Sequence, residues 1–398
     1  MVNILNLHRT IQMERKVLKT NKIKVPFFKP WITNEDKRAV MKALDNSLLT
    51  DGPILEKFEK EFASFTGAKY AIGVSNATSA LFLSLKALGI KKGDEIIIPD
   101  ITFVATANAV LQAGATPVFA DVEIDSMNIS SESIIKNINS KTKGIIPVHF
   151  AGRSCNMNNI VKIAKKNNLS IIEDCAHAIG ARLNKKHVGT FGNVGCFSFY
   201  PTKNITTIEG GMIITNSKKI KDYVSSLRNH GLTKTLAQRY SEGKPWDYDM
   251  LELGYNFRLD EIRSALGLSQ LKRINKLNGL RKNIYEHYNK KLKNIDGIIV
   301  PESSSKGDHV FHLYIMKVKN KISRDNLFEE LLKFGIKTSV HYKPLHKFET
   351  LKKFSKAKNL QNSNKIYDQI ITLPFYPNMS KKDQNYVINS ISKIMNNK

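Results

Sequence analysis

Short apolar segments alternate with amphipathic helical ones along most of the chain, and this alternation limits the possible fold more than any other feature. Seven segments have the length and composition of strands: residues 70–74, 95–99, 117–120, 145–149, 169–172, 196–200 and 212–215. Helical patterns separate most of them, which predicts an α/β fold with a mostly parallel sheet and helices on both faces. The last two strands are joined too briefly for a helical crossover, so one pair of strands should be antiparallel.

Two amphipathic helices are expected before the first strand, over residues 34–46 and 54–66, with Thr33 as the first N-cap and Gly67 as the second stop. After the last strand, a helix over 218–227 and a polar, irregular stretch over 233–249 lead into one or two long helices within 260–288. Beyond residue 294, strands at 312–317 and 337–340 and helices at 324–334 and 381–395 are typical of a smaller α+β domain.

We therefore divide the 398 residues into three parts: a basic N-terminal extension (1–24), a large domain that starts with an extended segment (25–285), and a small C-terminal domain (286–398). A loose helical stripe in the extension is formed by Ile4, Leu5, Leu7, Ile11 and Leu18. A targeting peptide or a membrane-surface helix would have this composition. A helix docked on the body, or a frayed basic tail, fits it better.

The chain carries 62 Lys and Arg against 35 Asp and Glu, a net charge of +27. Nucleic acid, an anionic membrane and small anionic substrates are therefore candidate partners. The basic residues are spread over helix faces without a recognition motif, which favours a lysine-rich surface over a nucleic-acid footprint.

No run approaches the roughly 20 apolar residues that span a bilayer, so we expect no membrane span. The three cysteines, Cys155, Cys175 and Cys196, have neither metal-type spacing nor a disulfide framework. We expect a reducing, cytoplasmic compartment and no metal site.

Lys203 lies in a proline turn between the last two predicted strands. A lysine between two buried strands is partly desolvated, which lowers its pKa and makes it a usable nucleophile; a solvated loop lysine is the ordinary alternative. Asp174 favours the nucleophile over the solvated lysine. It ends the strand that begins at 169, and ligands in open α/β sheets bind beyond the carboxyl ends of strands. Pyridoxal phosphate requires this pair: a lysine for the Schiff base and an acid that keeps the pyridine nitrogen protonated.

Two further segments follow strands in the same way. Residues 75–79, Ser-Asn-Ala-Thr-Ser, lie between a strand and a helix, where hydroxyls and free N–H groups form an anion site, although Ser and Thr are also ordinary N-caps. Phe103 lies just past the next strand and could stack on a flat ring or belong to the core.

Together these segments resemble the DegT/DnrJ/EryC1/StrS family of sugar aminotransferases, a branch of the fold-type-I pyridoxal-phosphate enzymes. The matching stretches are residues 49–53, 75–81, 102–106, 114–121, 147–152, 173–181, 197–204, 209–211, 228–231, 254–258 and 341–346. They follow the family order almost to the end of the chain and leave only the N-terminal extension uncovered.

The resemblance implies that Lys203 forms the Schiff base and then moves the proton between cofactor and substrate, while Asp174 binds the pyridine nitrogen. Phe103 would stack on one face of the ring. His177 would lie near the ring hydroxyl, at a position where many members have Gln.

The same resemblance implies a phosphate site made of Thr78, Ser79 and Ser198. Asn256 would reach this phosphate from the other subunit, which implies a homodimer with two shared sites. An Asn that caps the following helix is the structural alternative for Asn256.

The implied reaction has two halves. An amino acid, with glutamate as the expected donor, gives its amino group to the cofactor, and a keto-sugar on a nucleotide diphosphate then accepts it. Residues 147–152 and 341–346 look most like those of members that act on 4-keto-6-deoxy sugars. The candidate substrate contacts are Arg228, His230, His341, Tyr342 and His346.

Two other functions remain as alternatives. Some relatives are sugar dehydratases, which have His in place of the Schiff-base lysine, so Lys203 disfavours that reaction. A scaffold that binds nucleic acid or membrane through its basic surface is disfavoured because both Asp174 and Lys203 are present.

Overall fold

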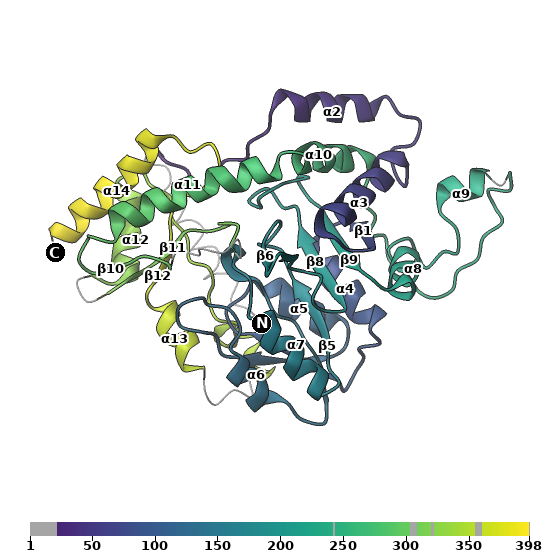
Figure 1. Ribbon diagram of the computed structural model, residues 1–398, viewed down its shortest axis with the longest axis horizontal. Helices are drawn as coiled ribbons and strands as arrows, with labels where there is room; N and C mark the ends of the chain where they lie inside the picture. The colour runs from purple at the N-terminus through teal and green to yellow at the C-terminus, as the bar shows by residue number, and fades with distance from the viewer. Residues whose placement is uncertain (1–21, 242, 303–308, 320–321, 355–359, 398) are drawn as a thin grey trace, which may run out of the picture.

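The computed structural model describes residues 22–241, 243–302, 309–319, 322–354 and 360–397, and its centre is a seven-stranded sheet (Figure 1). The order across the sheet is β1-β9-β8-β5-β4-β2-β3. Its strands are β1 (Tyr70–Val74), β2 (Glu95–Pro99), β3 (Thr116–Ala120), β4 (Thr142–Ile145), β5 (Ser170–Asp174), β8 (Val194–Ser198) and β9 (Gly211–Thr215). This confirms the predicted α/β class and the seven-stranded, mostly parallel sheet.

The sheet has two antiparallel pairs where the sequence predicted one. Strand β9 runs antiparallel to β8, as expected from the short link between them, and also antiparallel to β1, with Val74 opposite Gly211. The other pairs are parallel. All strands except β9 therefore point the same way, and their carboxyl ends share one edge.

Several predicted strands differ from the observed ones by a few residues at their ends, and two predictions differ more than this. The strand predicted over 145–149 is β4 and ends at Ile145, because Pro147 has no N–H for the ladder; only a single bridge, Val148 with Asp174, continues the pairing. The strand predicted over 337–340 is absent from the described structure. Isolated bridges, Ile336 with Val25 and Ser339 with Thr372, occur there instead.

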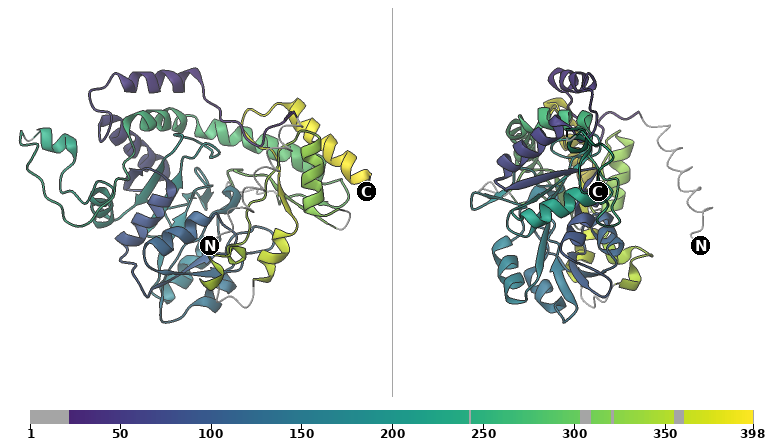
Figure 2. Two further views of the ribbon diagram at one scale, coloured as in Figure 1. Left: turned by 180° about the vertical axis from the view of Figure 1, so that it is seen from behind. Right: turned by 90° about the vertical axis from the view of Figure 1, so that its right-hand side faces the viewer.

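Helices cover both faces of the sheet (Figures 1 and 2). Successive side chains of a strand point to opposite faces, and accordingly Ile96 and Ile98 belong to one apolar cluster while Ile97 belongs to another. The helices of this part are α2 (Asn34–Leu44), α3 (Pro53–Thr66), α4 (Ala77–Ala87), α5 (Val104–Gln112), α6 (Ser131–Asn137), α7 (Met157–Lys166), α8 (Lys218–Leu227) and α10 (Glu261–Leu271). Burial on both faces explains the apolar runs in strands such as β2 and β9.

The predicted N-cap at Thr33 and the predicted helix end at Gly67 are confirmed. Thr33 caps α2 through a reciprocal bond pattern with Asp36, and Gly67 ends α3 in the left-handed conformation, with φ 78°. The irregular stretch over 233–249 contains one short helix, α9 (Leu236–Ser241), on an arm that extends from the body (Figure 1).

The C-terminal part has its own three-stranded antiparallel sheet and its own apolar cluster. Its elements are β10 (Ile298–Ile299), β11 (Ile315–Val318), β12 (Ile370–Thr372), α12 (Arg324–Lys333), α13 (Gln361–Tyr367) and α14 (Lys381–Asn396). The remaining short elements are β6 (Arg182–Leu183), β7 (Lys186–His187) and the 3-10 turns η1 (Phe150–Gly152), η2 (Leu345–Lys347) and η3 (Lys352–Phe354).

One helix, α11 (Ile274–Leu292), connects the two clusters: Leu277 packs in the sheet's cluster and Tyr288 in the C-terminal one. The proposed domain boundary at 285/286 falls inside this helix, and Val25 of the extended segment packs in the C-terminal cluster. The three-part division stays a prediction. The helical stripe proposed for the extension lies outside the described residues.

None of the helices in the described ranges combines the length and apolar character that a membrane-spanning segment needs.

Candidate active site

The shared carboxyl edge of the sheet brings together residues that are far apart in the chain. Asp174 ends β5, Ser198 ends β8, Phe103 follows β2 as the N-cap residue of α5, and residues 75–79 connect β1 to α4. Ligands bind at this edge in open α/β sheets. The topology therefore makes one site from these segments.

Asp174 is buried at this edge, with 5% of its surface exposed. Its Oδ2 accepts a hydrogen bond from Thr106 Oγ1 at 3.0 Å and its Oδ1 accepts one from Ala176 N at 3.1 Å. Burial raises the pKa of Asp174, while these hydrogen bonds and the charge of Lys203 act in the opposite direction. A proton-bearing cationic nitrogen beside this carboxylate would offset the cost of burying its charge.

Thr106 was missed as a partner of Asp174. It stands four residues after Thr102 on the first turns of α5, and the two hydroxyls are 3.1 Å apart. The available signal was the pair of threonines on either side of Phe103, just after a predicted strand, where polar side chains reach the carboxyl edge of the sheet.

Lys203 lies in the turn between β8 and β9, where its backbone N–H donates to Tyr200 O at 2.9 Å. Although part of the side chain is accessible, burial lowers the pKa of Lys203 to about 8, and the charge of Asp174 opposes this shift. A larger fraction of this amine is thus unprotonated near neutral pH than for an ordinary lysine. The expected desolvation of a nucleophilic amine is present.

Asn204 fixes this turn from the side of the C-terminal part. Its Nδ2 donates to Asn278 Oδ1 at 2.7 Å and to Val310 O at 2.9 Å, and its Oδ1 faces His312 Nδ1 at 3.0 Å. The position of Lys203 thus depends on partners of Asn204 that lie 74 to 108 positions away in the chain.

His177 and Tyr342, predicted as cofactor and substrate contacts, touch each other. Ala151 N–H donates to His177 Nδ1 at 3.3 Å, so in the neutral ring the hydrogen is on Nε2, which lies 3.1 Å from Tyr342 Oη. Burial keeps the pKa of His177 well below its usual value and raises that of Tyr342. Nε2–H therefore donates to Oη, which leaves the phenol hydrogen available for another acceptor.

Phe103 is 57% exposed, and its ring centroid is 5.9 Å from that of Tyr342. The exposed surface of Phe103 leaves room for a planar ring to stack on it, as the family resemblance implies.

The start of α4 has the properties of a phosphate site. Asn76 caps the helix by accepting from Ser79 N at 2.8 Å, and Ser79 Oγ lies 3.0 Å from Ser75 Oγ. The first-turn N–H groups, including that of Thr78, have no acceptor within the helix, as at any helix start. Ser198 is buried beside this region, where its Oγ accepts from Tyr200 N at 3.4 Å.

These residues fit pyridoxal phosphate. A buried carboxylate, a partly desolvated lysine, an exposed aromatic ring and a helix N-terminus supply what the nitrogen, aldehyde, ring and phosphate of this cofactor require.

Two of the predicted substrate contacts have hydrogen bonds within the fold, Arg228 through its side chain and His230 through its main chain. Arg228 is buried, and its Nη1 donates to Glu59 Oε1 at 2.6 Å and to Gly73 O. His230 is exposed, and its backbone N–H donates to Tyr255 O at 2.9 Å. These contacts tie the end of α8 to β1 and to residue 255, so a substrate role for either residue remains only a prediction.

The two histidines of residues 341–346 are anchored to different parts of the fold, His341 to strand β12 and His346 to the end of β2. His341 Nδ1 lies 3.0 Å from Thr372 Oγ1, and burial lowers the pKa of His341 to about 3. His346 Nδ1 lies 2.6 Å from Oδ2 of the fully buried Asp100, just after β2. The sequence analysis missed Asp100, whose place directly after a predicted strand was the available signal.

Asn256 has no hydrogen bond to the other cofactor candidates among the described contacts, although the next residue, Phe257, accepts from Ser75 N at 2.8 Å. Its backbone forms a bridge with Asn229, and its side chain is exposed. The helix that follows is capped by Asp260, which accepts from Arg263 N at 2.8 Å, so the capping alternative for Asn256 is wrong.

Comparisons with known proteins agree with this geometry. The profile of the DegT/DnrJ/EryC1/StrS aminotransferase family matches residues 30–392. The spore coat polysaccharide biosynthesis protein SpsC of Bacillus subtilis is 37% identical over 377 residues, which cover 93% of this chain and 97% of SpsC.

Solved structures give the same result. Helicobacter pylori PseC, an aminotransferase involved in the biosynthesis of pseudoaminic acid, superposes with a TM-score of 0.88 at 33% identity, covering 94% of this chain and 100% of PseC. A Streptococcus pneumoniae protein described as a sugar aminotransferase, in its PLP form, gives a TM-score of 0.86 at 28% identity, covering 94% of this chain and 99% of that one. The chain therefore belongs to the DegT/DnrJ/EryC1/StrS aminotransferase family and is a pyridoxal-phosphate-dependent sugar aminotransferase.

Proposed function

We propose that this enzyme transfers an amino group from an amino acid, glutamate, to a keto-sugar carried on a nucleotide diphosphate, a 4-keto-6-deoxy sugar. The product would be an amino sugar for a surface polysaccharide or glycan. The observation that carries the proposal is the placement of Asp174, at the end of β5, and Lys203, in the turn after β8, at the same edge of the sheet. The processes named for SpsC and PseC, biosynthesis of spore coat polysaccharide and of pseudoaminic acid, support an amino sugar for a glycan as the product.

In this reaction, pyridoxal phosphate supplies the electron sink that lets a proton leave the carbon next to the amino group. Asp174 would keep the pyridine nitrogen protonated through the negative charge of its carboxylate, which Thr106 and Ala176 orient by hydrogen bonds. Lys203 would accept the proton from the donor carbon and return it, which a pKa of about 8 permits near neutral pH. Thr78, Ser79 and Ser198 would bind the phosphate, and Phe103 would stack on the ring.

His177 and Tyr342 have a defined part in this proposal. The His177 ring is neutral and donates to Tyr342 Oη, so the Tyr342 hydroxyl presents its own hydrogen to an oxygen in the site. This orients Tyr342 without any change of charge.

The substrate class is tested by a screen. The pyridoxamine form of the enzyme is mixed with nucleotide-linked keto-sugars that differ in nucleotide, keto position and C6 hydroxyl. Return of the cofactor's pyridoxal absorbance identifies the acceptor, and no response to any 4-keto-6-deoxy sugar would contradict the proposed class.

We also propose a homodimer that shares its two active sites. Support comes from the arm around α9, where large apolar side chains are exposed, among them Trp246 (75%) and Leu253 (79%). Exposed apolar groups gathered on one segment mark an interaction surface. Asn256 follows this arm directly and is itself exposed, as a residue offered to another subunit must be.

Asn256→Ala should loosen cofactor binding about ten- to a hundredfold, because a hydrogen bond to a charged group contributes roughly 1.5–3 kcal/mol. Substrate preference should not change. Cofactor affinity is measured by titration of the cofactor-free protein, and the preference by competition between two sugars.

Subunit mixing tests the shared site directly. Arg258 lies two residues after Asn256, and its Nη1 donates to Oδ1 of Asn229, the residue that bridges to Asn256, at 2.6 Å. Inactive Lys203→Ala subunits are combined with inactive subunits altered at Asn256 and Arg258, so that a mixed dimer has one site with all three native residues. We expect partial activity from mixed dimers. Mixed dimers without activity, or an active monomer at assay concentration, would contradict the shared site.

The pH dependence of cofactor uptake reports on Lys203. Only the unprotonated amine attacks an aldehyde, so the rate of covalent uptake by the cofactor-free protein should rise with pH and level off above about 8. In Asp174→Asn the midpoint should move to lower pH, because the charge that raises the pKa of Lys203 is gone. If the uptake rate kept rising until the pH reached the ordinary lysine pKa of ~10.4, burial would not be lowering the pKa of Lys203.

A cytoplasmic location is part of the proposal. All three cysteines, Cys155, Cys175 and Cys196, are free and buried, as expected in a reducing compartment.

A further inference from the structure

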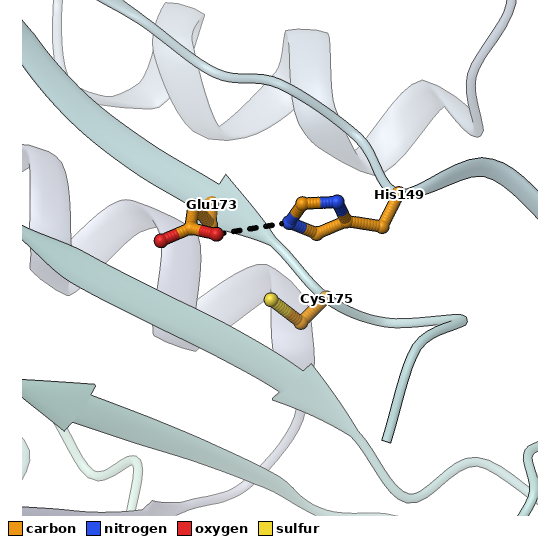
Figure 3. Close-up of side chains that lie close together, drawn as sticks. All are labelled: His149, Glu173 and Cys175. Atoms are coloured by element: carbon orange, nitrogen blue, oxygen red, sulfur yellow. Dashed lines mark hydrogen bonds and ion pairs between the residues drawn. The ribbon is translucent and has the colours of Figure 1, made fainter. Parts of the chain in front are cut away.

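Three buried side chains form a cluster directly behind Asp174. His149, Glu173 and Cys175 place one nitrogen, one oxygen and one sulfur within 4.8 Å of one another (Figure 3). Glu173 and Asp174 are neighbours on β5, so their side chains point to opposite faces of the sheet. Asp174 faces the proposed cofactor site and Glu173 faces this cluster.

The hydrogen bonds of the cluster are those of a closed network rather than of a metal site. His149 Nδ1 accepts from Cys155 N–H at 3.0 Å, so in the neutral ring the hydrogen is on Nε2, which donates to Glu173 Oε2 at 3.0 Å. Neither ring nitrogen then has a lone pair for a metal. The Cys175 thiol stays protonated, because burial raises its pKa well above the usual value.

Glu173 is fully buried, and its carboxylate is fully used. Oε1 accepts from Phe191 N and Gly192 N, both at 2.7 Å, and Oε2 accepts from Gly189 N at 2.7 Å as well as from His149. Two carboxylate oxygens have about four acceptor positions, so no further donor is needed. A buried charge is tolerated when it is satisfied in this way.

The backbone is shaped to deliver these bonds. Gly189 has φ 90°, a conformation that disfavours any side chain, and a Cβ there would lie 2.9 Å from the Phe197 ring. A Cβ on Gly192 would lie 2.7 Å from Ile171 O. Two glycines thus let the turn at 189–192 approach β5 closely enough to donate to Glu173.

His149 holds the same strand end from the other side. Its backbone N–H donates to Asp174 O at 3.1 Å, and Asp174 N–H donates to Pro147 O at 2.9 Å. The residue that pairs with Glu173 through its ring therefore pairs with Asp174 through its main chain. The last two residues of β5 are clamped between residues 147–149 and the turn at 189–192.

We propose that Glu173 and His149 are positioning residues for Asp174, fixing the end of β5 so that the Asp174 carboxylate meets the cofactor's pyridine nitrogen. The pair does not touch the reacting atoms and acts through the strand. This inference rests on the role proposed for Asp174.

The test measures whether the pair acts through Asp174. Glu173→Gln places an amide NH₂ where an oxygen accepts N–H bonds, and His149→Gln breaks the ring contact while leaving the three backbone bonds to Glu173. Each substitution is made alone and with Asp174→Asn. The readouts are the Kd for pyridoxal phosphate and the ¹⁵N chemical shift of its labelled pyridine nitrogen in the bound state.

Each single variant should raise the Kd about tenfold, in the range typical of residues that orient a ligating group, and move the nitrogen signal toward the unprotonated value. In the Asp174→Asn background the same substitutions should leave the signal in place and change the Kd by less than about twofold, because the group they position is already lost.

Glu261→Gln is the matched control. Glu261 is also fully buried and accepts three backbone N–H bonds, from Gly52 at 3.2 Å, Ile54 at 2.8 Å and Leu55 at 2.9 Å. The Glu261→Gln variant should lower the Tm as Glu173→Gln does, but it should not move the ¹⁵N signal of the pyridine nitrogen.

Equal losses of affinity in both backgrounds, or an unmoved nitrogen signal in the single variants, would overturn the positioning role. If Glu173→Gln does not fold, the result for His149→Gln decides. If neither variant folds, the pair supports the fold in general, and the positioning role is equally overturned. A protonated nitrogen in Asp174→Asn alone would instead reject the role of Asp174.

Discussion

Lys203→Ala is expected to abolish amino transfer and the visible absorbance of the covalently bound cofactor, while the protein keeps its fold. Lys203 is the amine that the site desolvates beside Asp174, and burial lowers its pKa to about 8. No other group in the proposed mechanism can both form the covalent link and move the proton. Absorbance spectra and single-turnover assays with glutamate measure the two losses separately.

Lys317→Ala is a suitable control for this experiment. Lys317 is also partly buried, its Nζ lies 3.7 Å from Asp125 Oδ1, and burial lowers its pKa. This variant should change stability without changing the spectrum of the bound cofactor. A Lys203→Ala protein that keeps both its colour and its turnover would contradict the assignment.

Asp174→Asn is expected to lower kcat by several orders of magnitude, each factor of ten corresponding to about 1.4 kcal/mol of barrier. The amide keeps the size of the side chain and can still accept from Thr106, but it lacks the charge that holds a proton on the pyridine nitrogen. The electron sink is weakened, while cofactor binding persists. Rates of both half-reactions and the absorbance of the bound cofactor are the measurements.

Asp36→Asn separates this effect from the general cost of changing a buried aspartate. Asp36 is fully buried and paired with Arg273, on the side of α2 and α10. We expect it to lower the Tm with little change in kcat. A near-normal kcat in Asp174→Asn would show that this carboxylate does not tune the cofactor.

Local sequence patterns determined the elements of this protein. Strands β1 and β2 and helix α8 match their predicted ranges, and the capping residue Thr33 and the stop at Gly67 act as expected. These signals work because periodicity, capping and left-handed glycine conformations depend on a few neighbouring residues. The position of Asp174 at a strand end and of Lys203 in a turn between strands was predictable for the same reason.

The order of the strands was decided only in three dimensions. Strand β9 inserts between β8 and β1, so two antiparallel pairs form although the chain indicates one. Most strands are buried on both faces, and a strand buried on both faces has no pattern that specifies its neighbours.

The partners of the site residues were likewise decided by tertiary structure. Thr106 lies 68 positions from Asp174, and Asp100 lies 246 positions from His346, yet each pair is within hydrogen-bond distance. The tautomer of His177 depends on the Ala151 N–H, and the lowered pKa of Lys203 depends on the packing around it. Sequence alone determined which residues could carry the chemistry, whereas protonation and orientation depend on burial and long-range hydrogen bonds, which exist only in the folded chain.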